Sequence, residues 1–149
     1  MRRIKTALFL MVTAAVMMFS ATVFAADLNS EVIYFVNAER VANGLAPLGY
    51  SERLSRPAAV RANDITVHFA HQRPDGSEVK SVLEGASYDW FGENLAVSSV
   101  QDSQKIVRAW MNSPTHRANL LNRHFTQMAV ACVRGDDGHF YWAQLLASD

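Results

Sequence analysis

The sequence contains one cysteine, Cys132, among 149 residues. A single cysteine cannot form an intramolecular disulfide, so the fold must be held by its core rather than by cross-links. Cys132 lies in a stretch that alternates like a strand, and we interpret it as a buried, small apolar side chain. An intermolecular disulfide is the alternative.

The sequence also lacks an excess of either charge, since 14 Lys and Arg residues balance 14 Asp and Glu residues. There is no basic patch or cationic run, and this excludes nucleic acid as a partner. Charge alone would not draw such a domain to an anionic membrane surface. Internal repeats, low-complexity tracts and linkers are missing too, which predicts a single domain.

The longest apolar run covers residues 7–19 and, at about thirteen residues, is too short to span a bilayer comfortably. It follows the basic segment Met1–Lys5, and it precedes small residues at Val23 and Ala25. This arrangement is typical of a cleavable signal peptide. We therefore predict a signal peptide over residues 1–25 and one domain over 26–149, exported to the periplasm or the extracellular space, with no integral membrane anchor after cleavage. A monomer is the default expectation.

Apolar spacing and cap residues predict mainly helices in the first two thirds of the domain. The second helix carries an apolar stripe that includes Phe69, and Pro57 within it predicts a kink or restart near its first turn. The expected helices run from Asn29 or Ser30 to Gly44, from Ser51 to Phe69, from Ser77 to Glu84, from Asp102 to Met111, and from Pro114 to Leu121.

The last part of the chain is rich in β-formers. Two strands are expected, Gln127–Arg134 and His139–Leu146, joined by a hairpin turn over 135–138. The second strand is apolar on both faces, and such a strand must be covered on both faces. This predicts a small antiparallel sheet between helices.

Four polar clusters stand out and are expected at helix ends or helix-to-strand junctions, where side chains can converge. They are Phe69-Ala-His71, Gly92-Glu-Asn-Leu95, Trp110 to Arg117, and His124-Phe-Thr-Gln127.

With further short motifs, these clusters make a series that covers nearly all of residues 26–149. It opens with Asn37-x-x-Arg40 and Gly44-Leu-x-Pro-Leu48, and continues with Arg61-Ala-x-Asp64 and with Phe69 to Gly76. Gly92-Glu-Asn94, Trp110 to Leu121 and Tyr141-Trp-x-Gln144 complete it. Six motifs in this order resemble the CAP superfamily, also called the SCP/PR-1-like family, and in particular its small bacterial secreted members.

The resemblance implies an α+β fold, a three-layer α-β-α sandwich, which agrees with the elements read from the sequence. It also implies a cleft in which two histidines and two acidic residues are suggested to bind a divalent metal. The matching residues are His71, Glu93 and His124. The second acid has no match, because Asn112 or Ser113 takes its place, and His116 matches a histidine of the bacterial pattern.

The resemblance therefore implies a metal site of His71, Glu93, His124 and His116. Imidazole and carboxylate are ordinary zinc ligands, so zinc is the expected cofactor. The first three are also the catalytic candidates, because a His–Glu hydrogen bond suits general-base catalysis. No nucleophile is evident. Ser113 is interpreted as the cap before Pro114, so hydrolysis would require activated water.

Structural roles remain open for several of these residues. Glu93 and Asn94, expected in a loop after Gly92, could satisfy neighbouring backbone donors. His116 and Arg117, in the first turns of a short helix, could bond loop carbonyls. Asn94, Ser113 and Arg117 are therefore taken as supporting residues of the site.

The leading functional hypothesis is a non-catalytic binding module whose ligand is a divalent metal or a small, lipid-like or envelope-derived molecule. One alternative is a metal- or base-assisted hydrolase of peptides or envelope polymers, and the missing second acid counts against it. The other alternative is a protein-interaction module of the envelope, for which analogy of fold is the only support.

Overall fold

The computed structural model describes residues 28–149. The predicted signal peptide over residues 1–25 lies outside this range. None of the helices in the described part is both long enough and apolar enough to cross a membrane.

A four-stranded sheet forms the centre of the molecule. Its strands are β1 (Gly49–Tyr50), β2 (Trp90–Ser98), β3 (Gln127–Arg134) and β4 (Phe140–Ser148), and their spatial order is β1-β3-β4-β2. β1 pairs with β3 in parallel, and the other pairs are antiparallel. The hairpin of β3 and β4 confirms the sequence prediction, and β2 is an edge strand.

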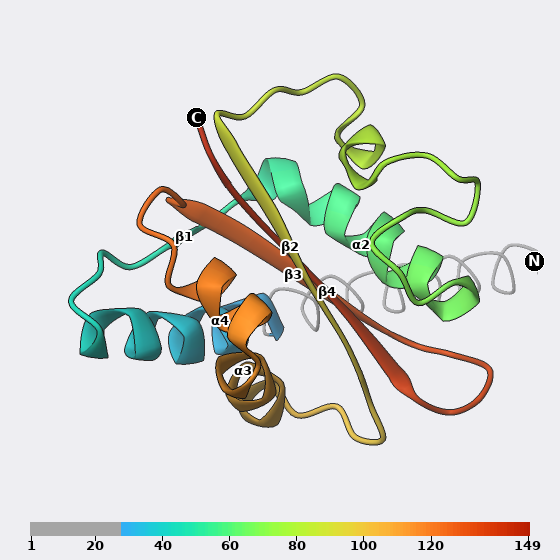
Figure 1. Ribbon diagram of the computed structural model, residues 1–149. Coiled ribbons are helices and arrows are strands. Elements are labelled where there is room, and N and C mark those ends of the chain that lie inside the picture. The colour runs from blue at the N-terminus through green and yellow to red at the C-terminus, as the bar shows by residue number, and fades with distance from the viewer. Residues whose placement is uncertain (1–27) are drawn as a thin grey trace, which may run out of the picture.

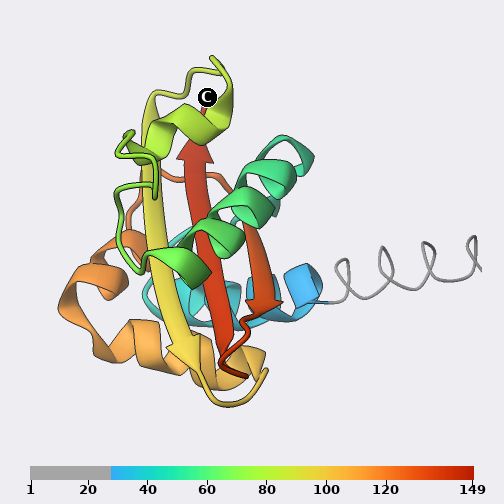
Figure 2. The same ribbon diagram turned by 90° about the vertical axis from the view of Figure 1, so that its right-hand side faces the viewer.

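Helices cover both faces of this sheet, as Figures 1 and 2 show. α2 (Glu52–Val67) packs on β3 and β4 from one side, followed by the short 3-10 helix η1 (Val79–Leu83). The other face is covered by the helix over residues 28–42, by α3 (Ser103–Asn112) and by α4 (Pro114–Leu120). The predicted three-layer α-β-α sandwich is therefore confirmed.

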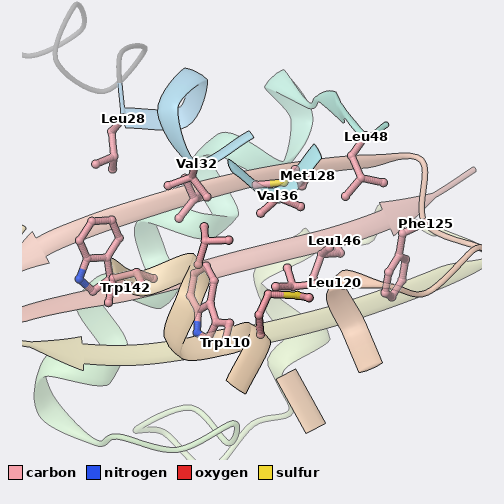
Figure 3. Close-up of a cluster of buried hydrophobic side chains, with 14 residues drawn as sticks. Leu28, Val32, Val36, Leu48, Trp110, Leu120, Phe125, Met128, Trp142 and Leu146 are labelled. Atoms are coloured by element: carbon pink, nitrogen blue, oxygen red, sulfur yellow. The ribbon is translucent and has the colours of Figure 1, made fainter. Parts of the chain in front are cut away.

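The larger core lies between the sheet and the helix over 28–42, α3 and α4 (Figure 3). It is filled by large side chains, including the fully buried indoles of Trp110 and Trp142. Cys132 packs partly buried against this core, and burial raises the pKa of its thiol to about 12. Such a thiol stays protonated, in keeping with its interpretation as a small apolar side chain.

The core under α2 is built from smaller residues. Ala58 and Ala62 of the helix face Ala129 and Ala143 of the sheet, and all four are fully buried. Short side chains on both surfaces allow close packing of helix and sheet. The apolar stripe predicted for this helix is thus confirmed up to Ile65. Phe69 lies beyond the last helical residue and is exposed, because α2 ends at Val67.

Four further expectations about local structure require correction. The first described helix already includes residue 28, so Asn29 is not its cap. Instead, the Asn29 side-chain oxygen accepts a hydrogen bond from the backbone nitrogen of Val130 on β3 (2.8 Å). α2 runs without interruption through Pro57, and the helix expected from Ser77 is the 3-10 turn η1. Glu93 and Asn94 lie within strand β2, not in a loop.

Side chains from the α3–α4 layer cover the free edge of β2. The Asn119 amide donates to the backbone oxygen of Glu93 (3.0 Å), and the Trp110 indole donates to that of Leu95 (3.1 Å). An edge strand otherwise presents unpaired carbonyls to other chains. These two bonds fix α3 and α4 against the strand that carries Glu93.

A buried arginine organises the loops on the same side of the sheet. Arg40 is only 1% exposed, and its guanidinium donates to the carbonyl oxygens of Ala46, Leu120, Asn122 and Phe125. Burial lowers its pKa below the ordinary value. Arg40 therefore sets the course of the segment that carries His124.

Candidate functional site

The site is centred on a carboxylate buried between α2 and β2. Glu93 accepts a hydrogen bond from Arg61 Nε at its Oε2 (2.6 Å), and its Oε1 lies 3.2 Å from a second guanidinium nitrogen. The exposed fractions of the two side chains are 3% and 0%. The ion pair is therefore withdrawn from water, which makes each charge depend on the other.

His71 contacts the carboxylate of this ion pair from the solvent-exposed side. Its Nδ1 is 2.8 Å from Glu93 Oε1, while 66% of the His71 side chain is exposed. A carboxylate can only accept, so Nδ1 carries the proton and donates it to Glu93. Nε2 is then left as the nitrogen available to a ligand. The sequence prediction that His71 and Glu93 come together is supported by this contact.

The segment around His71 is held by further charges. Arg61 also donates to the backbone oxygen of Ala70 (2.7 Å) and contacts Asp64 (3.1 Å). Asp64 in turn accepts from Arg73 Nε (2.7 Å). Burial alone would lower the pKa of Arg61, but Glu93 and Asp64 together raise it above the ordinary value.

His116 approaches from α4, on the other side of the sheet. Its Nδ1 is 2.7 Å from the hydroxyl of Ser113. Ser113 stands at the N-terminus of α4, but its side chain makes no capping bond. Ser113 is thus the N-cap residue of α4, as predicted, but its hydroxyl contacts the His116 imidazole instead of a backbone nitrogen of the helix. Burial, followed by the charge of nearby His71, lowers the pKa of His116.

Buried amides connect His116 to the sheet. Asn94 lies on β2, where its amide nitrogen donates to Gln144 Oε1 on β4 (2.9 Å) and is 3.4 Å from the His116 backbone oxygen. Its own side-chain oxygen accepts from Asn119 (2.9 Å). Asn94 thus links β2 to β4 and to α4 by hydrogen bonds, and it lies in a strand, not in the expected loop.

His124 stands apart from these contacts. Its ring stacks on the exposed ring of Trp90, with centroids 4.0 Å apart and planes inclined by 7°. Arg117, taken as a supporting residue, is exposed on α4. Within residues 28–149, no three His, Cys, Asp or Glu side chains are grouped so that they could hold a metal ion. The structure thus joins Glu93 to His71 and brings His116 near, but does not assemble all four predicted ligands.

Sequence reasoning missed two residues that matter most to this geometry. Arg61 was noticed only as part of a motif, and Trp90 was not singled out. A signal existed for Arg61. It lies three residues after Ala58 and four residues before Ile65, and this spacing puts it on the buried side of the helix beside the apolar stripe. A charged residue at such a position requires a partner, and Glu93 is that partner.

We expect Glu93→Gln to lower the free energy of unfolding by about 3 kcal/mol, because it leaves the buried Arg61 without its main counter-charge. Glu84→Gln is the matched control, since the Glu84–Arg56 ion pair is exposed and its loss should cost about 1 kcal/mol or less. Urea unfolding of both variants measures the difference. Equal losses would contradict a structural role for the buried pair.

The lowered pKa of His116 predicts a pH effect on stability. The unfolded chain binds a proton at this residue more readily than the folded chain, so stability falls as pH drops below about 6.5. His116→Asn should reduce the loss of unfolding free energy between pH 7.5 and pH 5. Exposed His68 provides the control, as His68→Asn. An unchanged loss in His116→Asn would refute the assignment.

Comparison with known proteins agrees with this fold. The model of the cysteine-rich secretory protein (CAP) family matches residues 33–146. The uncharacterized protein YkwD of Bacillus subtilis is 37% identical over 107 residues, which are 69% of this chain and 41% of YkwD. The chain therefore spans less than half the length of that relative.

Solved structures share the architecture at low sequence identity. An extracellular protein of Bacillus anthracis with an SCP domain gives a TM-score of 0.71 at 22% identity, over 84% of this chain and 41% of that one. The crystal structure of NaASP2 with Zn²⁺ gives 0.59 at 12%, over 80% and 82%. The family match and the shared fold lead to one conclusion: this chain belongs to the cysteine-rich secretory protein (CAP) family.

Proposed function

We propose that this CAP domain is an exported, non-catalytic binding module whose ligand-facing groups are the imidazoles of His71 and His116. Export rests on the signal-peptide pattern over residues 1–25. An extracellular relative of the same fold in Bacillus anthracis is consistent with it. The observation that carries the binding role is the buried Arg61–Glu93 pair beneath an exposed histidine.

A buried ion pair is costly to form, and apolar residues of similar volume would often give equal stability. Here the pair does more than fill space, because Glu93 holds the His71 ring in one orientation and one tautomer. A side chain with 66% of its surface exposed has no packing reason to be held so firmly. The arrangement is instead suited to present His71 Nε2 to a ligand.

The ligand we propose is zinc. A carboxylate that accepts from Nδ1 while Nε2 faces a metal is the usual support of a zinc-bound histidine. His116 offers the same arrangement, since its Nδ1 is occupied by Ser113 and its lowered pKa favours the neutral ring. NaASP2, which has a related fold, has a crystal structure with Zn²⁺.

The donor set fits zinc only in part. Zinc sites in proteins generally use three or four protein ligands, and the described residues provide no such group. Both oxygens of Glu93 are engaged by Arg61, and His124 is stacked on Trp90. We therefore assign the metal to His71 and His116, with water completing its coordination, and assign Glu93 the role of orienting His71.

Calorimetric titration of the metal-stripped protein with zinc tests this assignment. We expect one zinc per chain, with binding weakened at least about tenfold in His71→Ala and in His116→Ala. His139→Ala is the control, because His139 is exposed in the hairpin turn. A folded wild type that does not bind zinc would refute the metal.

His124→Ala distinguishes a zinc site made of His71 and His116 alone from one that also includes His124. Unchanged zinc affinity is expected, since the His124 ring contacts Trp90 rather than His71. Loss of zinc binding in this variant would overturn the two-imidazole assignment and show that His124 leaves Trp90 to become a ligand.

One observation favours a second candidate function, a base-assisted acyl hydrolase. If His116 Nδ1 is the unprotonated nitrogen, the Ser113 hydroxyl donates to it across 2.7 Å and becomes a nucleophile. Ser113 Oγ would attack an ester carbonyl while its proton passes to His116 and on to the leaving alcohol. Water would then hydrolyse the acyl-serine.

A fluorophosphonate probe separates this candidate from the binding module. The hydrolase predicts covalent labelling that is lost in Ser113→Ala and retained in Ser87→Ala, a replacement of an exposed serine. The binding module predicts no labelling of wild type. Labelling that persists in Ser113→Ala would exclude Ser113 as the nucleophile.

A further inference from the structure

A second candidate binding site lies between the helix over residues 28–42 and the start of α3. A hollow of about 580 Å³ is lined there by Glu31, Tyr34, Phe35, Gln101, Asp102 and Gln104, among others. Small-molecule sites commonly have volumes of about 300–1,000 Å³. The lining includes neither His71 nor His116, so the hollow is separate from the site described above.

One wall of the hollow is aromatic. The Tyr34 side chain is 69% exposed, and its ring meets the Phe35 ring edge to face, with centroids 5.3 Å apart and planes inclined by 73°. Phe35 is half-buried against the main core. Tyr34 therefore rests on a partly buried neighbour while most of its surface remains open to a ligand.

The remaining lining is polar and can both donate and accept hydrogen bonds. Gln101 and Gln104 each carry an amide with donors and acceptors. Gln101 is half-buried. Gln104 follows in the first turn of α3 and is exposed.

Two carboxylates at the hollow are held in place. Glu31 accepts from the Ser103 hydroxyl (2.8 Å), and Asp102 accepts from the backbone nitrogen of Lys105 (2.9 Å). Each keeps further acceptor capacity, because a carboxylate has about four lone-pair positions. Groups that are already oriented cost less entropy when a ligand binds.

This lining restricts the class of ligand. The carboxylates of Glu31 and Asp102 disfavour phosphates and other anions, because like charges repel. A lipid chain would require an enclosed apolar cavity, whereas this hollow is open to solvent and its apolar wall is interrupted by Gln101, Gln104 and the carboxylates. An aromatic ring beside amides and carboxylates suits a molecule with apolar C–H faces and many hydroxyls.

We propose that the hollow binds an uncharged carbohydrate chain, with one sugar ring stacked on Tyr34 and its hydroxyls hydrogen-bonded to Gln101 and Gln104. The C–H face of a pyranose is apolar, and its hydroxyls both donate and accept, as the two amides do. This site does not depend on zinc or on the His71 imidazole.

The test is titration of the ¹⁵N-labelled protein with two oligosaccharides, the β-1,4-linked tetramer of N-acetylglucosamine and maltotetraose. We expect at least one of them to shift the amide signals of residues 31–35 and 101–104 with a Kd below about 1 mM. Tyr34→Ala should weaken binding about tenfold through lost stacking. Gln104→Ala should weaken it about fivefold through lost hydrogen bonds.

Tyr50→Ala is the matched control, because Tyr50 is another exposed tyrosine, 47% exposed, on β1. His71→Ala should bind the oligosaccharide like wild type, so failure of the zinc site leaves this proposal standing. The proposal is overturned if neither oligosaccharide shifts the signals, or if Tyr34→Ala binds as wild type does. It is also overturned if decanoic acid, rather than a sugar, occupies the hollow in a Tyr34-dependent manner.

Discussion

The ion pair between Arg61 and Glu93 is the interaction on which the site depends. It joins α2 to the edge strand β2 through two residues that are 32 positions apart in the chain. Neither charge could remain buried alone, because each depends on the other to offset lost hydration. The same guanidinium also bonds the carbonyl of Ala70, so the loop that carries His71 is set by the pair as well.

A second buried arginine, Arg40, also holds loops in place, on the opposite side of the sheet and without a carboxylate partner. Arg40 uses four loop carbonyls as acceptors, and burial lowers its pKa because no carboxylate partner compensates for the lost hydration. Asn37 lies one turn earlier, and its side-chain amide holds the backbone of Leu48. The amide oxygen accepts from the Leu48 nitrogen, and the amide nitrogen donates to the Leu48 oxygen. The Asn37-x-x-Arg40 motif is therefore explained by loop geometry, and it requires no ligand.

Elements with regular apolar patterns could be predicted from the sequence, because their residues contact near neighbours in an expected order. The hairpin of β3 and β4 is such a case, with apolar residues on both faces and a turn of Gly and Asp. β2 could not be predicted, since Glu93 and Asn94 interrupt its apolar pattern. Their partners, Arg61 and Gln144, come from distant parts of the chain.

The site was predicted in its residue types but not in their roles. His71 and Glu93 do meet, but the engagement of both Glu93 oxygens by Arg61 depends on a contact between distant parts of the chain. Ser113 before Pro114 has the pattern of a helix cap, and only the fold shows its hydroxyl on His116. His124 lies on a segment directed by Arg40, and its ring contact is with Trp90, a residue without a motif.

His71 and His116 both lie beside the edge strand β2, which positions each of them through a neighbouring residue. Successive residues of a strand point to opposite faces, so Glu93 supports His71 from the α2 side and Asn94 contacts His116 from the α4 side. Each imidazole has its Nδ1 engaged, by a carboxylate in one case and a hydroxyl in the other. The tautomer of His71 follows from the carboxylate, which can only accept. That of His116 is not fixed in this way, because a hydroxyl can donate or accept. Zinc binding through Nε2 requires the His116 proton on Nδ1, whereas acyl transfer by Ser113 requires that proton on Nε2. The position of a single proton therefore separates the two functions that this geometry allows.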